Sequence, residues 1–290
     1  MGALLDPPLL RRLEGLALQV RRSVSGQMGG ERRSTARGRS VEFADFRSYS
    51  PGDDFRLIDW NAYARLDRFM LRLFVAEQEL PLSIFVDLSG SMDWGRPNKA
   101  ATARRLAGAI AYVALAALDR VRLTVFAAGP TSGGAPYRGR RAVAELFSRL
   151  QSFPTGGPTD YSRLVWPIAR QRPGMTVFIS DGLGESPIEP AIAALGSARQ
   201  EGAVLQLLAP QELAPDWNGD ARLRDAETGV ERELTLTPAT RAAYIGALAT
   251  RTAEIERSAH RRGLRFARLS TDQPIEDMVF QALRRLGLLR

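Results

Sequence analysis

From Pro81 onward, short apolar runs alternate with longer segments of helical periodicity. The runs are apolar at consecutive positions rather than at every second position, which is typical of strands buried on both faces. The predicted strands cover residues 82–87, 121–127, 175–180, 203–209 and 264–269. The predicted helices cover residues 99–118, 142–150, 161–170, 190–201, 239–261 and 275–286.

Alternating strands and helices predict an α/β fold with a mostly parallel, Rossmann-type sheet and helices on both faces. We expect residues 81–290 to form this domain. One stretch breaks the pattern, because polar and apolar residues alternate over 221–236 around Glu227-Thr228-Gly229. This stretch predicts a β-hairpin inserted at about residues 220–236, near the edge of the sheet.

The first 40 residues have a different character. Four apolar residues share one face of a short amphipathic helix, namely Leu9, Leu13, Leu16 and Val20. Residues 25–40 are small, polar and basic, which favours a flexible link. Eight arginines face only three acids in residues 1–40, a net charge of +5. This basic leader is either a solvated segment or an arm for an anionic partner.

Residues 41–80 are dense in aromatic and charged side chains. A turn is predicted at Pro51-Gly52-Asp53 and a strand over residues 69–75. We expect this segment to pack on the main domain.

The amino-acid composition excludes several kinds of functional site. The chain of 290 residues has no cysteine, which excludes disulfides, zinc-thiolate sites and cysteine nucleophiles. Its N-terminus lacks the uninterrupted apolar core of a signal peptide, and no run reaches the roughly 18 apolar residues of a membrane helix. We therefore expect a cytoplasmic protein. The net charge is +8, and Lys99 is the only lysine among 40 basic residues.

Three loops rich in oxygen ligands follow predicted strands or lie near their ends. The first contains Asp87, Ser89 and Ser91, the second contains Thr159 and Asp160, and the third contains Asp181. Each loop alone is explained by capping of the next helix. Ligands of an open α/β sheet, however, bind beyond the carboxyl ends of the strands. The three loops together therefore indicate one shared site.

Asp87-x-Ser89-x-Ser91, followed by Thr159 and Asp181, resembles the metal-ion-dependent adhesion site (MIDAS) of von Willebrand factor A domains. The preceding segment PGDDFRLIDWNAYAR resembles the signature of the bacterial domain-of-unknown-function family 58, in which a von Willebrand A-like domain follows. The resemblance covers roughly residues 38–290. Its signature residues are Gly52, Asp53, Asp54, Arg56, Ile58, Asp59, Trp60, Ala64 and Arg65.

Hydroxyl and carboxylate oxygens suit a hard cation such as Mg²⁺, with Mn²⁺ or Ca²⁺ as alternatives. Ser89, Ser91 and Thr159 would supply neutral oxygens, and Asp87 and Asp181 would supply charge. With few anionic ligands the ion stays electron-poor, and the resemblance implies that it then accepts a carboxylate from another protein. Two points stay open here: Thr155 is a fallback for Thr159, and Asp160 is expected to cap the next helix.

The resemblance also implies a partner. Members of this family are often encoded beside MoxR-type AAA+ ATPases, so we expect a non-catalytic adaptor that brings a client protein to such an ATPase for remodelling, maturation or metal insertion. The signature would form either a partner surface or a structural network of arginine–carboxylate pairs with Trp60 and Tyr63 packed inward. The residues concerned are Asp53, Asp54, Arg56, Asp59, Trp60 and Arg65.

Two functions from other classes compete with the adaptor. In a Mg²⁺-dependent hydrolase or phosphatase, Asp87 would accept a phosphoryl group, but Ser89 stands where a second aspartate is usual. The only histidine, His260, lies in a basic helical stretch and is expected at the surface. In a nucleic-acid-binding protein the arginine excess would contact phosphates, with a steep salt dependence. No phosphate-binding loop of the GxxxxGK[ST] type is present.

Overall fold

The computed structural model describes residues 3–19, 41–76, 80–127, 130–132, 135–184, 186–216 and 218–290. The chain divides into two compact units. The larger comprises Met1–Val24 and Leu80–Arg290, and the smaller comprises Ser25–Glu79. Among the described residues, no helix is long and apolar enough to cross a membrane.

A seven-stranded sheet forms the centre of the larger unit, in the order β11-β8-β7-β3-β4-β5, with β6 also paired to β4. The five strands from β11 to β4 are parallel, and the short β5 and β6 run antiparallel to β4. The bounds are β3 Pro81–Asp87, β4 Arg120–Phe126, β5 Pro130–Ser132, β6 Tyr137–Arg138, β7 Met175–Ser180, β8 Glu201–Leu208 and β11 Arg265–Ser270.

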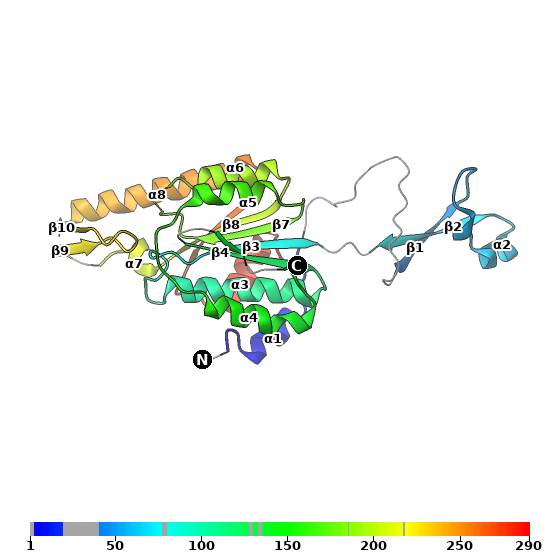
Figure 1. The fold of residues 1–290 in the computed structure, drawn as a ribbon, viewed down its shortest axis with the longest axis horizontal. Coiled ribbons are helices and arrows are strands. Elements are labelled where there is room, and N and C mark those ends of the chain that lie inside the picture. The colour runs from blue at the N-terminus through cyan, green and yellow to red at the C-terminus, as the bar shows by residue number, and fades with distance from the viewer. Residues whose placement is uncertain are drawn as a thin grey trace. The chain divides into compact units, whose positions relative to one another are not determined.

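Helices cover both faces of the sheet (Figure 1). One face carries α1 Pro7–Leu13, α3 Lys99–Ala116, α4 Val143–Ser152 and α9 Ile275–Asp277, which continues as a π-helical segment Met278–Leu283. The other face carries α5 Val165–Ala169, preceded by the 3-10 helix Tyr161–Leu164, with α6 Glu189–Ser197 and α8 Pro238–Arg261. Short helical turns lie at α7 Pro210–Leu213 and Arg140–Ala142. This arrangement confirms the predicted α/β class.

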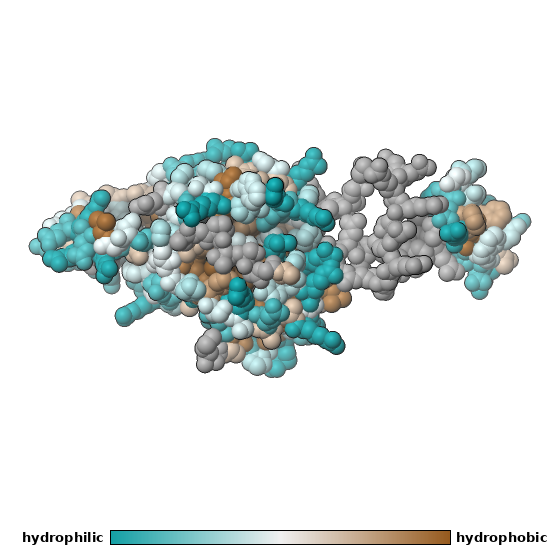
Figure 2. Space-filling model, in the orientation of Figure 1, coloured by the Kyte–Doolittle hydropathy of each residue, from teal (hydrophilic) through white to brown (hydrophobic). Residues whose placement is uncertain are grey.

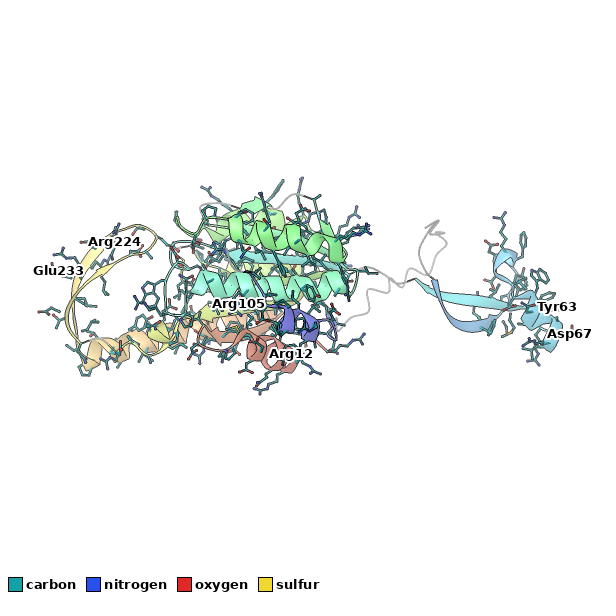
Figure 3. All side chains as sticks on the ribbon, turned by 90° about the horizontal axis from the view of Figure 1, so that it is seen from below. Arg12, Tyr63, Asp67, Arg105, Arg224 and Glu233 are labelled. Carbon is teal, nitrogen blue, oxygen red and sulfur yellow. The ribbon has the colours of Figure 1, made fainter. Side chains whose placement is uncertain are left out.

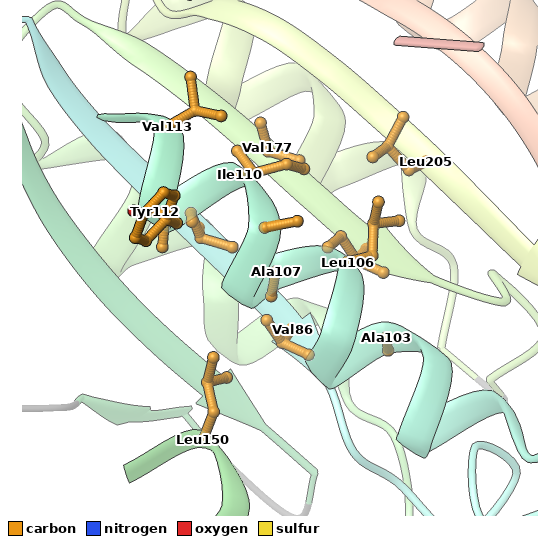
Figure 4. Packing of buried hydrophobic residues seen from close by; sticks show 14 of the residues in the cluster. Val86, Ala103, Leu106, Ala107, Ile110, Tyr112, Val113, Leu150, Val177 and Leu205 are labelled. Carbon is orange, nitrogen blue, oxygen red and sulfur yellow. The ribbon is translucent and has the colours of Figure 1, made fainter. Parts of the chain in front are cut away.

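Successive residues of each strand face opposite layers, so the sheet divides the core in two. Val86 of β3 packs with Val177, Leu205 and the residues of α3, whereas Phe85 packs with Phe178 on the opposite face. Figure 4 shows the α3 layer, in which Ala103 and Ala107 bring the helix close to the strands. Because alanine has a small side chain, an alanine-rich helix can approach a sheet closely and be buried on most sides, as predicted.

The described part of the first 40 residues belongs to the larger unit and does not stand apart as a leader. Asp6 caps α1 by accepting a hydrogen bond from the Leu9 amide at 2.8 Å. Leu9 and Leu13 are fully buried against the core. Beyond the helix, Leu18 forms a β-bridge with Leu289 near the C-terminus. The predicted link at residues 25–40 lies outside the described residues.

The predicted hairpin is confirmed as a separate two-stranded antiparallel sheet of β9 Gly219–Arg224 and β10 Glu231–Leu236. It precedes α8 and extends beyond the end of the main sheet (Figure 1). Most of its side chains are exposed. Its strands are therefore held by their mutual hydrogen bonds rather than by burial in the core.

The smaller unit is an antiparallel pair, β1 Val41–Ser48 and β2 Met70–Ala76, joined by the 3-10 helix Phe55–Leu57 and by α2 Trp60–Leu66. Asp54 and Asp59 cap these two helices with their side chains, and Asp53 forms an ion pair with Arg47 at 2.8 Å. Tyr63 stacks on Phe69, whereas the Trp60 side chain is 61% exposed within this unit.

Exposed apolar side chains gather on the surface of the smaller unit (Figure 2). They include Phe55, Trp60 and Leu66, each more than 60% exposed. Arg56 and Arg65 of the signature are also exposed. The carboxylates of the signature thus have local structural roles, while its tryptophan and its two arginines face solvent within this unit.

Candidate metal centre

Parallel pairing of β3 with β7 brings two of the predicted loops to the same edge of the sheet. Val86 is paired with Ile179, so Asp87 and Ser180 follow at adjacent strand ends. The Ser180 hydroxyl donates a hydrogen bond to Asp87 Oδ2 at 2.7 Å. The Tyr161 hydroxyl lies 2.8 Å from Ser180 Oγ and joins the 3-10 helix of the second loop to the same network.

Hydrogen bonds within the first loop hold the side-chain oxygens of Asp87, Ser89 and Ser91 close together. Asp87 Oδ1 accepts a hydrogen bond from the Ser89 amide at 3.0 Å, and the two serine hydroxyls, Ser89 Oγ and Ser91 Oγ, lie 3.1 Å apart. Asp87 and Ser89 are fully buried, whereas Ser91 is partly exposed. The loop therefore presents its two hydroxyls together, with Ser91 on the open side.

Backbone hydrogen bonds join the second loop to the first. The Gly90 amide donates to Gly157 O at 2.9 Å, and the Gly156 amide donates to Leu88 O at 2.9 Å. Thr159 follows in this loop and is buried. Asp160 caps the next 3-10 helix by accepting from Ser162, as predicted. The fallback residue Thr155 instead accepts a hydrogen bond from Arg104.

The third loop contains a buried ion-pair network that sequence reasoning missed. Lys99 Nζ lies 2.8 Å from Asp181 Oδ2 and 2.5 Å from Glu212 Oε1. Burial alone would lower the pKa of Lys99, but the two carboxylates hold this pKa above its ordinary value. Lys99 is the only lysine of an arginine-rich chain, and this rarity is the signal that could have identified it as part of a buried ion pair. A compact ammonium fits a small buried site between two carboxylates.

Burial makes the charged form of Asp87 unfavourable. Burial raises its pKa to about 7, and the nearby Asp181 charge acts in the same direction, while hydrogen bonds from Ser180 and Ser89 partly oppose the shift. Tyr161 is also fully buried, and burial raises the pKa of its phenol well above its ordinary value. This tyrosine therefore acts as a neutral hydrogen-bonding group beside the carboxylates.

The donor set fits a small hard cation. Ligands at roughly 2.0–2.1 Å and at right angles around an octahedral ion are about 2.9 Å apart, close to the separation of the two serine hydroxyls. Throughout the described segments, no three His, Asp or Glu side chains converge in a way that could hold a metal ion. A cation bound here would therefore depend on the hydroxyls of Ser89, Ser91 and Thr159 together with Asp87 and Asp181.

One further carboxylate meets this centre and was not among the predicted ligands. Glu227 lies at the tip of the β9–β10 hairpin, and its Oε1 accepts a hydrogen bond from Thr159 Oγ1 at 2.7 Å. The Thr159 amide donates to Oε2 of the same carboxylate at 2.8 Å. Glu227 stands 68 residues beyond Thr159 in the chain, so no local pattern pointed to this contact.

Comparison with known sequences identifies the family. A family model described as "Protein of unknown function DUF58" matches residues 45–254. The chain belongs to this family. The DUF58 chain is 31% identical over 298 residues to uncharacterized protein Rv1480 of Mycobacterium tuberculosis and, equally, to uncharacterized protein Mb1516 of Mycobacterium bovis. Each match covers 99% of this chain and 93% of the relative.

Several solved structures resemble the DUF58 chain. Protein BatB from Bacteroides thetaiotaomicron is 17% identical, with a TM-score of 0.43 over 72% of this chain and 98% of that chain. The VWA (von Willebrand factor A) domain of SpRpn10 is 11% identical, with a TM-score of 0.40 over 70% and 95%. Manganese-loaded TRAP protein from Plasmodium vivax is 19% identical, with a TM-score of 0.36 over 45% and 58%.

Proposed function

We propose that this DUF58 protein is a non-catalytic interaction module whose binding of a partner depends on a divalent cation. The observation that carries the proposal is the convergence of three loops, two of them at the ends of β3 and β7, on one small centre, where Ser89 Oγ and Ser91 Oγ lie 3.1 Å apart beside Asp87. An ion held here would be coordinated largely by neutral hydroxyls. It would keep enough positive charge to attract a carboxylate from a partner protein.

The environment of Asp87 supports binding over hydrolysis. A phosphoryl acceptor needs a carboxylate oxygen that can reach the substrate, but Asp87 is fully buried. Its Oδ1 already accepts from the Ser89 amide and its Oδ2 from Ser180. His260, the only histidine, is exposed at the end of α8 and lies in none of the three loops. We therefore assign Asp87 to holding and orienting the ion.

The partner we propose is a MoxR-type AAA+ ATPase, with this chain bringing a client protein whose Asp or Glu binds the cation. Support for this ATPase comes from the resemblance of residues 51–65 to the family signature, since family members are often encoded beside such ATPases. The test is capture of a purified MoxR-type ATPase with Mg²⁺ and with a chelator. Capture that is equal in both conditions would contradict a metal-dependent adaptor.

Titration of Mg²⁺ and Mn²⁺ by calorimetry tests the metal centre itself. We expect saturable binding by the native chain and at least a tenfold loss in Asp87→Asn and Ser91→Ala, because each removes a proposed ligand. Ser197→Ala is the control, since this exposed serine lies on α6 and donates a hydrogen bond to Ala193 O of its own helix. Thermal melts establish that each variant is folded. Equal binding by all four proteins would refute the site.

A further inference from the structure

The tip of the β9–β10 hairpin is built to hold one carboxylate in place. Asp225 Oδ1 accepts hydrogen bonds from the amides of Glu227 and Thr228 at 3.0 and 2.7 Å, and from the Thr228 hydroxyl at 2.9 Å. The turn ends at Gly229, whose φ of 72° lies in the left-handed region that favours glycine. Glu227 therefore projects from a turn that is already ordered by its own hydrogen bonds.

This tip packs directly on the first loop of the metal centre. A Cβ atom added at Gly90 would lie 2.4 Å from Ala226 O and 3.3 Å from Glu227 Cα. Gly90 stands between Ser89 and Ser91, and only glycine at this position lets the backbone of the first loop come so close to the backbone of the hairpin tip. The hairpin tip therefore contacts the centre at Gly90 as well as at Thr159.

The rest of the hairpin stands away from the sheet. A cavity of about 1200 Å³ lies beside its strands and is lined by residues of the hairpin, of α7 and of α8. Ser91 and Trp94 line the same cavity, so it reaches the open side of the metal centre. Figure 3 shows the hairpin as an arch, with Arg224 and Glu233 on its strands. Such an arch could lift at its tip without disturbing the core.

Resting on the proposed function, we propose that Glu227 is an internal carboxylate ligand that closes the metal centre. It occupies the place that a partner's carboxylate would take, so partner binding requires displacement of the hairpin tip. A hydroxyl carries one hydrogen and two lone pairs. Thr159 can therefore donate to Glu227 and still direct a lone pair toward the cation. The ligand that displaces Glu227 is an Asp or Glu side chain of a protein partner.

Mn²⁺ alone is the probe that tests this role, with Glu227→Gln compared with Glu233→Gln. The control removes the same charge from the same hairpin, but the Glu233 side chain is 80% exposed on β10. We measure Mn²⁺ affinity and the water-proton relaxation of bound Mn²⁺. Loss of a direct ligand should weaken binding by roughly tenfold in Glu227→Gln. It should also add about one exchanging water to the six-coordinate ion, as water fills the vacated position.

Hydrogen exchange of residues 225–230 provides a second readout. We expect faster exchange at the tip in Glu227→Gln and native rates in Glu233→Gln. If Mn²⁺ binding depends on Asp87 but is unchanged in affinity and water count by Glu227→Gln, the internal ligand is refuted while the metal-dependent function stands. If the native chain binds no Mn²⁺, the proposed function itself fails, and the ligand role of Glu227 fails with it.

Discussion

At the scale of single residues, the candidate metal centre depends on how buried charges are balanced. Asp87 and Asp181 are both fully buried at neighbouring strand ends, and each carboxylate costs free energy unless it is paired or hydrogen-bonded. Ser180 supplies a hydrogen bond to Asp87, and Lys99 supplies the opposite charge to Asp181. The one lysine of the chain thus maintains the geometry of the third loop.

Replacing Lys99 should therefore be strongly destabilising. Lys99→Met leaves Asp181 and Glu212 without their buried counter-ion, which we expect to lower the free energy of unfolding by about 3–5 kcal/mol. Arg163→Met is the control, because the pair between Arg163 and Asp160 is largely exposed and should be worth less than about 1 kcal/mol. Urea denaturation of both variants measures the difference. Similar losses in both would argue against a stabilising role for the buried network.

The carboxylate of Asp119, directly before β4, predicts that the stability of the protein depends on pH. Burial raises its pKa to about 6 from 3.8, although the Leu80 amide donates a hydrogen bond to it at 2.9 Å. The folded protein therefore binds this proton more tightly than the unfolded chain does. The stability that this proton contributes is present below about pH 4 and is lost as the pH rises through about 6.

Asp119→Asn should remove the loss of stability at higher pH, because the asparagine side chain does not ionise. Its amide oxygen can still accept the hydrogen bond from the Leu80 amide. We expect the variant to be more stable than the native chain by about 1–2 kcal/mol at pH 7, less than the full shift implies because the side chain is partly solvated. The two proteins should converge near pH 4. Urea denaturation between pH 4 and 7 measures the difference in the free energy of unfolding between the two proteins. A difference that stays constant over this range would contradict the raised pKa of Asp119.

At the scale of elements, short segments gain their structure from what they pack against. The seven-residue α1 is too short to be stable alone in water, but it buries Leu9 and Leu13 against the main core. The hairpin shows the opposite case, because most of its side chains are exposed and its tip contacts Thr159 of the candidate metal centre. One element therefore belongs to the core, whereas the other lies mostly outside it.

Truncation of α1 side chains tests its contribution to the core. Leu9→Ala should lower the free energy of unfolding by about 2–4 kcal/mol, because it removes a fully buried side chain and leaves a cavity. Arg11→Ala on the exposed side of the same helix should change it by less than about 0.5 kcal/mol. Chemical denaturation of the two variants distinguishes a packed helix from a solvated leader, for which both changes would be small.

At the scale of the whole molecule, parallel strands collect distant loops at one edge. Asp87, Thr159, Asp181 and Glu227 are spread over 140 residues, yet hydrogen bonds and ion pairs join all their loops around one centre. A second compact unit, Ser25–Glu79, carries the family signature and its exposed aromatic side chains. The chain thus keeps its candidate metal centre and its signature in separate units.

The sequence by itself determined the five parallel strands, the main helices that cover them and the identity of the family. Strands buried on both faces appear as unbroken apolar runs, so residues 175–180 were predicted with the bounds of β7. The Asp87-x-Ser89-x-Ser91 pattern was equally visible, because these three proposed ligands lie within five consecutive residues. Capping by Asp160 was also predicted, since a cap is a local interaction within three residues.

Only the tertiary structure decided the contacts between segments far apart in the chain. The ion pair of Lys99 with Glu212 spans 113 residues, and the bond of Thr159 to Glu227 spans 68. Neither has a periodic signature, because each depends on where strand ends and a hairpin tip meet in space. Exposure of Trp60 within its unit could not be predicted either, since an aromatic residue looks alike in sequence whether it packs in a core or faces solvent. Local patterns therefore determined the elements, and packing determined the centre they build.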